Sequence, residues 1–204
     1  MLRVSDGAYR FDQRMIFSQA SIELEPESIY FLKGENGAGK TTFLEVIAGV
    51  RALSAGMMSV EDSVRTHYIG HKSGISKQLT AYENLTYALA IRGVRGSNIN
   101  TRQGVESALN YFGIAHLIDL PLAYFSAGQK RKVVLAALLL IDASVLLLDE
   151  PYTSLDQPSC ALLNKLLLQF RDKGCTVLLT SHVQPQLERL RLLELKDKKL
   201  VSYS

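Results

Sequence analysis

"GENGAGKTT", residues 34–42, is the stretch of sequence that decides the fold. It satisfies the pattern GxxxxGK[ST], follows the apolar segment SIYFLK and opens the helical segment TTFLEVIAG. The glycines of such a loop let successive backbone N–H groups turn inward around phosphates, and this context argues against an ordinary glycine-rich turn. The stretch therefore predicts a nucleotide-phosphate site formed by Gly34, Glu35, Asn36, Gly37, Ala38, Gly39, Lys40, Thr41 and Thr42.

Two side chains of this loop have distinct chemical tasks. We expect Lys40 to reach the β- and γ-phosphates, because an ammonium group there meets the highest negative charge. The hydroxyl of Thr41 can bind Mg²⁺. The loop thus predicts both a phosphate contact and a metal ligand.

A second motif is acidic: the apolar segment Val145–Leu148 ends in Asp149 and Glu150. Burying two unpaired carboxylates is costly, and a phosphate site with Mg²⁺ supplies the counter-charge. Asp149 then fits a ligand of Mg²⁺, direct or through water, and Glu150 fits the residue that orients and deprotonates an attacking water. The alternative is that Asp149 and Glu150 are only a solvated strand end, and the phosphate loop earlier in the chain argues against it.

The order of the apolar segments predicts an α/β fold with a mainly parallel sheet. Ser28–Lys33, Val145–Asp149 and Thr176–Thr180 are short, alternate with helical stretches and end in glycine or polar residues. Between them lie two helix-like segments, Ala81–Ile91 and Thr101–Phe112, separated by GVRGSN. We therefore expect one nucleotide-binding domain, residues 1–204, with a small helical subdomain inserted at about residues 81–130.

Composition excludes several classes of protein. The net charge of +3 arises from dispersed charges and gives no argument for nucleic-acid binding. The longest apolar run, Val133–Ile141, is far shorter than the ~20 residues of a membrane span and predicts a buried helix. The N-terminus does not resemble a secretory signal, so we expect a cytosolic chain. Cys160 and Cys175 have no metal-site spacing and are expected to be reduced thiols.

A further candidate site lies at Phe125–Gln129, FSAGQ, which precedes the expected helix Lys130–Ile141. Small residues at the start of a helix suit the capture of an anion by exposed N–H groups and a serine hydroxyl. Taken alone, the same residues would be an ordinary helix cap. Their position ahead of the acidic motif favours the anion site.

Together these motifs resemble the ATP-binding-cassette ATPases over nearly the whole chain. The phosphate loop, SAGQ, LLLDEP, the triplet Ser154-Leu155-Asp156 and the strand that ends in His182 occur in that family's order and spacing. The resemblance implies ATP and Mg²⁺ as bound groups and a head-to-tail dimer with a second copy of the chain. It also implies that Lys40, Glu150 and His182 are catalytic, with His182 sensing the γ-phosphate.

The resemblance assigns roles to residues that spacing alone does not. Ser126 and Gly128 would contact the γ-phosphate held by the second copy, and Asp156 would belong to the loop that couples the two sites. An aromatic residue near the N-terminus would stack on adenine. Phe11 is at about the right distance from the phosphate loop, with Tyr9 as its competitor.

The chain departs from the family pattern in two places. Ala127 and Phe125 stand where glycine and leucine are usual, which changes the shape of the helix entrance without removing a phosphate contact. His71 stands where a glutamine usually joins the core to the helical subdomain and touches Mg²⁺. Imidazole can accept or donate a hydrogen bond there, with a charge that depends on pH.

The second departure narrows the resemblance. IGHKSGI followed by LTAYENL, FSAGQKRKV, LLLDEPYTSLD and TSH looks like the ATP-binding subunits of cytochrome c maturation complexes. This implies peripheral attachment to integral membrane subunits at the cytoplasmic face of a bacterial inner membrane. ATP hydrolysis would drive haem export or the release of a haem-loaded chaperone.

Other functions stay open from the sequence. An ABC transporter subunit for another small molecule is the nearest alternative, since no residue here specifies haem. A cassette acting on DNA or ribosomes usually carries a coiled-coil insertion or two cassettes. A nucleotide-binding scaffold without turnover is disfavoured because Glu150 and His182 are both present.

Overall fold

The computed structural model describes residues 1–71, 74–91 and 101–203, and the chain divides into two compact units. The core unit comprises Met1–His71, Ala143–Pro151 and Leu166–Ser204, and the helical unit comprises Lys72–Asp142 and Tyr152–Lys165. Residues 81–130 fall within the helical unit, and their assignment as an inserted subdomain stays a prediction.

The core unit contains a six-stranded sheet with the order β5-β6-β7-β3-β8-β9. All neighbouring strands are parallel except β8 and β9, which pair antiparallel. The mainly parallel α/β fold expected from the sequence is confirmed. The strands are β3 (Ile29–Lys33), β5 (Thr66–Ile69), β6 (Val145–Leu148), β7 (Thr176–Thr180), β8 (Leu190–Lys196) and β9 (Lys199–Tyr203).

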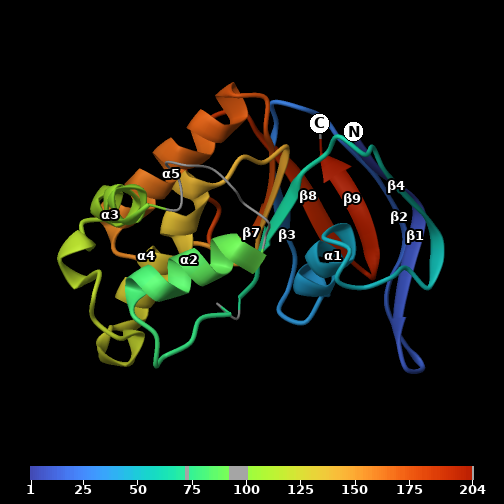
Figure 1. Cartoon of the computed structure of the whole chain (residues 1–204). Helices are drawn as coiled ribbons and strands as arrows, with labels where there is room; N and C mark the ends of the chain where they lie inside the picture. The colour runs from blue at the N-terminus through green and yellow to red at the C-terminus, as the bar shows by residue number, and fades with distance from the viewer. Residues whose placement is uncertain (72–73, 92–100, 204) are drawn as a thin grey trace. The chain divides into compact units, whose positions relative to one another are not determined.

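The same unit contains a second, three-stranded antiparallel sheet with the order β2-β1-β4, which the sequence analysis did not predict (Figure 1). Its strands are β1 (Leu2–Phe11), β2 (Arg14–Leu24) and β4 (Ala55–Val60). In β1, Leu2 and Val4 are buried while their neighbours are exposed. This alternation of buried and exposed residues is typical of a strand with one face on the core.

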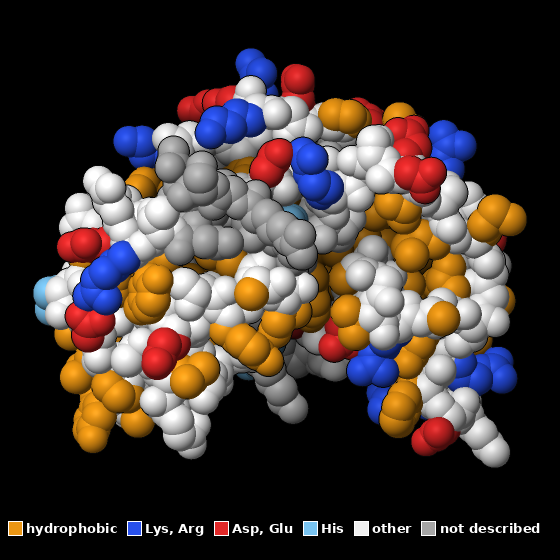
Figure 2. Space-filling view, in the orientation of Figure 1, with side chains coloured by type: hydrophobic (Ala, Val, Ile, Leu, Met, Phe, Trp, Pro, Cys, Tyr) orange, Lys and Arg blue, Asp and Glu red, His pale blue; other side chains and the backbone are white. Residues whose placement is uncertain are grey.

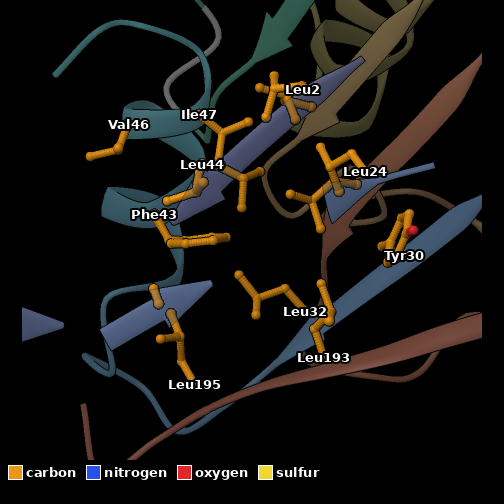
Figure 3. Close-up of a cluster of buried hydrophobic side chains, with 14 of the residues drawn as sticks. Leu2, Leu24, Tyr30, Leu32, Phe43, Leu44, Val46, Ile47, Leu193 and Leu195 are labelled. Carbon is orange, nitrogen blue, oxygen red and sulfur yellow. The ribbon is translucent and has the colours of Figure 1, made fainter. Parts of the chain in front are cut away.

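The core of this unit forms where both sheets and α1 (Lys40–Ile47) bring apolar side chains together (Figure 3). Phe43 and Leu44 of α1 are fully buried, as is Leu32 of β3. The ring of Phe43 meets that of Phe17 edge to face, with centroids 5.3 Å apart. This packing fixes α1, and with it the phosphate loop that precedes α1.

The helical unit contains α2 (Ala81–Ile91), α3 (Arg102–Tyr111), α4 (Ala127–Ala136) and most of α5 (Gln157–Asp172), which ends in the core unit. The first two match the helical segments read from the sequence. Thr101 caps α3, since its hydroxyl accepts a hydrogen bond of 3.1 Å from the N–H of Gly104. The predicted separator GVRGSN, residues 93–98, lies outside the described residues.

The expected helix Lys130–Ile141 has different bounds in the structure. It begins three residues earlier, at Ala127, because Ser126 caps it. It ends at Ala136, and residues 137–140 continue as a buried 3-10 helix before Ile141 becomes extended. No helix in the described part of the chain is long and apolar enough to cross a bilayer.

Candidate nucleotide site

The phosphate loop of the core unit leads directly into α1. Gly39 precedes the helix in a left-handed conformation with φ of 103°. A Cβ atom on Gly39 would lie 2.6 Å from Cγ2 of Ile16, so both the backbone angle and the packing require glycine. The first N–H groups of α1 have no partner within the helix, which is the arrangement that binds anions.

Lys40 lies across the loop rather than extending into solvent. Its ammonium group donates hydrogen bonds of 2.7 Å to the carbonyl oxygen of Gly34 and 3.0 Å to that of Glu35. These bonds hold the charge at the loop entrance before α1. The loop and its lysine therefore form a compact structure that can enclose phosphates.

Asp149 lies at the carboxyl end of β6 and is only 1% exposed. The hydroxyl of Thr41 donates a hydrogen bond of 2.8 Å to Oδ2, and the hydroxyl of Thr180 donates one of 2.7 Å to Oδ1. The carboxylate is thus oriented by two hydroxyl groups from different elements. Thr180 was missed from the sequence, although the segment that ends in TSH contains it.

The oxygen donors of this site suit Mg²⁺. The Thr41 hydroxyl and the Asp149 carboxylate are adjacent, and both are the hard oxygen ligands that Mg²⁺ prefers. Among the described residues there is no group of three or more histidine, cysteine, aspartate or glutamate side chains that could hold a metal by itself. The donors present therefore fit a magnesium ion that is bound partly by nucleotide phosphates and water.

Glu150 follows Asp149 and is also buried, with 8% of its surface exposed. Its backbone N–H donates a hydrogen bond of 2.9 Å to the hydroxyl of Thr180. Its Oε2 accepts one of 3.1 Å from the backbone N–H of His182, and its Oε1 lies 3.8 Å from Nε2 of His182. The carboxylate is thereby held at the end of the sheet, next to an imidazole that is 63% exposed.

These groups line one cavity of about 410 Å³ in the core unit. The structure thus brings together most of the loop, the acidic motif and both histidines named from the sequence, while Gly34, Glu35 and Ala38 of the loop do not line this cavity. Arg14 and Ile16 line the same cavity and were not named from the sequence. The lining residues are Arg14, Ile16, Asn36, Gly37, Gly39, Lys40, Thr41, Thr42, His71, Asp149, Glu150 and His182.

The two candidates for the aromatic position lie in different environments. Tyr9 packs against the core, where its ring stacks on Phe17 at 6.2 Å and its hydroxyl accepts a hydrogen bond of 3.0 Å from Arg51. Phe11 lies at the end of β1 with 58% of its surface exposed. The structure therefore leaves Phe11, and not Tyr9, available to a ligand.

The FSAGQ motif lies in the helical unit and forms a capping box. The hydroxyl of Ser126 accepts a hydrogen bond of 3.1 Å from the N–H of Gln129, whose side chain in turn accepts one of 2.8 Å from the N–H of Ser126. A Cβ atom on Gly128 would lie 2.7 Å from the carbonyl oxygen of Ser154. Glycine is therefore required there, and the motif contacts the Ser154–Asp156 triplet.

The helix entrance tolerates the two departures from the family pattern. Ala127 is exposed and is the first residue of α4, where the helical backbone does not require glycine. Phe125 is buried, with 4% of its surface exposed. With these two residues in place, Ser126 still caps the start of α4.

Asp156 is fixed in the same unit by two partners. The N–H of Ser159 donates a hydrogen bond of 2.9 Å to Oδ1, and the ammonium of Lys132 on α4 lies 3.1 Å from Oδ2. The bonds from Ser159 and then the charge of Lys132 lower the pKa of Asp156 to about 2. The carboxylate therefore stays charged at neutral pH.

Comparison with known proteins agrees with this geometry. The model of the family described as ABC transporter matches residues 17–153, more than half of the chain. A cytochrome c biogenesis ATP-binding export protein CcmA from Vibrio parahaemolyticus is 34% identical, and the match covers 94% of this chain and 99% of that protein. The chain belongs to the CcmA family of ABC transporter proteins. A protein of the same description from Saccharophagus degradans is 33% identical, over 91% of this chain and 89% of its own.

Solved structures agree with this fold. The ATP-binding subunit of an ABC transporter superposes with a TM-score of 0.88 at 22% identity, covering 100% of this chain and 90% of that one. A dimeric bacterial ABC transporter cassette superposes with a TM-score of 0.85 at 18% identity, covering 98% and 96%. Together with the family, these findings confirm the predicted resemblance to ABC-type ATPases. The roles of the individual site residues stay predictions.

Proposed function

We propose that this chain is the ATP-hydrolysing subunit of a membrane complex for cytochrome c biogenesis. The observation that carries the proposal is the cavity in which the phosphate loop, Asp149, Glu150 and His182 meet, in a member of the CcmA family. The cavity supports ATP hydrolysis, and the family supports the process that it serves. The two parts of the proposal can be tested separately.

In this proposal the phosphates bind at the start of α1. Backbone N–H groups of the loop and the charge of Lys40 bind the β- and γ-phosphates, and Lys40 exchanges its bonds to Gly34 and Glu35 for bonds to phosphate oxygens. Thr41 and Asp149 would hold Mg²⁺. When bound, this ion neutralises charge on the phosphate oxygens.

Glu150 acts on the attacking water. Its carboxylate accepts the proton of a water molecule as that water attacks the γ-phosphorus, and the bond to the β-phosphate oxygen breaks. The hydrogen bond from the N–H of His182 holds the carboxylate in place for this task. The exposed imidazole of His182 is then available to donate a hydrogen bond to the γ-phosphate.

A second copy of the chain would complete the site. Ser126 and Gly128 would contact the γ-phosphate bound by the other copy, in a head-to-tail dimer. Asp156 would couple the two ATP sites of the dimer. The close approach of Gly128 to Ser154 and the ion pair between Lys132 and Asp156 support this role, because they connect the FSAGQ motif to the Ser154–Asp156 triplet. Because the copies have to meet, we expect the purified chain to be monomeric and to hydrolyse ATP poorly without membrane subunits.

The membrane subunits are proposed partners, and the cytoplasmic face of a bacterial inner membrane is the proposed location. Exposed hydrophobic side chains on the helical unit suit such a partner, and they are visible in the region of α2 (Figure 2). Tyr87 and Ile91 of α2 are 61% and 67% exposed, and Tyr124 is 75% exposed. His71 lines the ATP cavity and would link hydrolysis to these partners.

The proposed role in cytochrome c biogenesis is tested by deleting the gene and staining c-type cytochromes for haem. We expect those cytochromes to be lost while other haem proteins remain, with recovery by the parental chain and not by the Glu150→Gln variant. Normal c-type cytochromes in the deletion strain would support the alternative, an ABC transporter subunit for another small molecule. In the complex, hydrolysis would drive the export of haem or the release of a haem-loaded chaperone.

A further inference from the structure

The turn between β1 and β2 places a basic side chain beside the nucleotide cavity. Phe11 and Arg14 are paired directly across this hairpin, and the next pair is Arg10 with Met15. Residues opposite one another in an antiparallel pair point to the same face, and successive pairs point to opposite faces. Arg14 therefore shares a face with the exposed ring of Phe11, and Arg10 lies on the other face.

Arg14 lines the same cavity as Lys40 and Thr41. Among the described residues, none forms an ion pair or hydrogen bond with its guanidinium group. Arg3, on β1 of the same sheet, is by contrast paired with Glu23. Within the described part of the core unit, Arg14 is thus left available to meet a ligand.

The positions of the other groups limit which part of a nucleotide Arg14 can meet. The proposed site puts the γ- and β-phosphates at Lys40, and the resemblance to ATP-binding-cassette ATPases would put the adenine at Phe11, the exposed one of the two aromatic candidates. Arg14 is next to Phe11 on the hairpin and also reaches the cavity of the phosphate loop. The part of ATP between the base and the β-phosphate is the ribose with the α-phosphate, and the α-phosphate is the part that carries charge.

We propose that Arg14 is a nucleotide-binding residue whose guanidinium group contacts the α-phosphate. This inference rests on the proposed ATP site and adds a residue to it. Guanidinium groups form paired hydrogen bonds with phosphate oxygens. Since Arg14 is exposed, its contribution to affinity is about fivefold, equivalent to about 1 kcal/mol.

The test compares Arg14→Gln with Arg10→Gln in the purified chain. Arg10 is a matched control because it is exposed, lies on the same hairpin and faces the other side. Affinities for ATP and ADP are measured by titration calorimetry, and those for AMP and adenosine by competition with a fluorescent nucleotide. We expect Arg14→Gln to lower the affinity for ATP, ADP and AMP by the same factor of about five, and to leave the affinity for adenosine unchanged.

Each other result overturns the inference. A loss of affinity for ATP and ADP with no loss for AMP would place Arg14 at the β-phosphate. A loss of affinity for adenosine would place it at the base or the ribose. Unchanged affinities, or an equal loss in Arg10→Gln, would remove Arg14 from the site. A Lys40→Ala variant tests the proposed site separately: parental affinity in that variant would show that the phosphates bind elsewhere, and both proposals would fail.

Discussion

Replacing Thr180 with valine tests how the two carboxylates of the site are held. The side chain is fully buried, and its hydroxyl donates to Oδ1 of Asp149 and accepts from the N–H of Glu150. Valine keeps the shape and removes both hydrogen bonds. A buried bond to a carboxylate contributes about 2 kcal/mol and a neutral bond about 1 kcal/mol, so we expect a loss of about 3 kcal/mol in the free energy of unfolding.

Thr176→Val is the matched control on the same strand. Thr176 is 3% exposed, and its hydroxyl donates a hydrogen bond of 2.7 Å to the carbonyl oxygen of Glu25. That variant loses only the neutral bond, and we expect a cost of about 1 kcal/mol. With a slope of about 2.5 kcal/mol per M, the midpoint of urea unfolding falls by about 1.2 M for Thr180→Val and about 0.4 M for Thr176→Val.

The urea midpoints are measured by circular dichroism on the purified chain, and ATP turnover is measured in the assembled membrane complex. We expect Thr180→Val to lose most of its turnover, because Asp149 and Glu150 lose a group that orients them, and Thr176→Val to keep it. Thr180→Ser restores the hydroxyl and should recover turnover. Equal midpoints and equal turnover in the two valine variants would refute the role assigned to Thr180.

Four further predictions concern the site and the helical unit. Lys40→Ala should abolish turnover and weaken ATP binding at least tenfold, measured by calorimetry, because it removes the cation for the β- and γ-phosphates; parental turnover in the complex would contradict this. Glu150→Gln should bind ATP and form a stable dimer without hydrolysis, seen as a larger species in sedimentation, and a parental rate would show that Glu150 is not the base. His71→Gln should keep most of the ATPase activity of the complex while His71→Ala uncouples it from cytochrome maturation, so equal effects of the two would exclude a coupling role. The pKa of Asp156 is lowered to about 2, first by the hydrogen bonds from Ser159 and then by Lys132, so its charge stabilises the fold fully above about pH 4 and this stabilisation is lost as the pH falls toward 2. The urea midpoints of the parental chain and of Asp156→Asn should therefore converge over that range, and a constant difference between them would contradict the lowered pKa.

Much of the candidate site could be predicted because its chemistry is local in the sequence. The phosphate loop needs glycines at fixed positions and a lysine at the start of a helix, and these residues are contiguous. The capping box at Ser126 is equally local, since it joins residues three positions apart. The parallel sheet also follows from local patterns, because buried strands read as short apolar runs between helices.

The residue expected to stack on adenine is one that the sequence alone could not decide. Tyr9 and Phe11 are two residues apart, and a regular strand would place both side chains on the same face. In the structure Tyr9 packs against the core, whereas Phe11 is the last residue of β1, where the strand turns into β2, and is 58% exposed. Which of the two rings is covered depends on residues far away in the sequence, so the sequence of β1 left both as candidates.

The sequence by itself determined the phosphate loop, the acidic motif and the α/β class, whereas it placed the start of the helix after FSAGQ three residues too late. Only the tertiary structure decided how they meet: Thr41 reaches Asp149 from 108 residues away, and Thr180 reaches it from 31 residues away. The same holds for Arg14, whose place in the cavity follows from the pairing of β1 with β2. The physical reason is that threonine hydroxyls and surface arginines have no local signature, because their roles come from partners that folding brings to them.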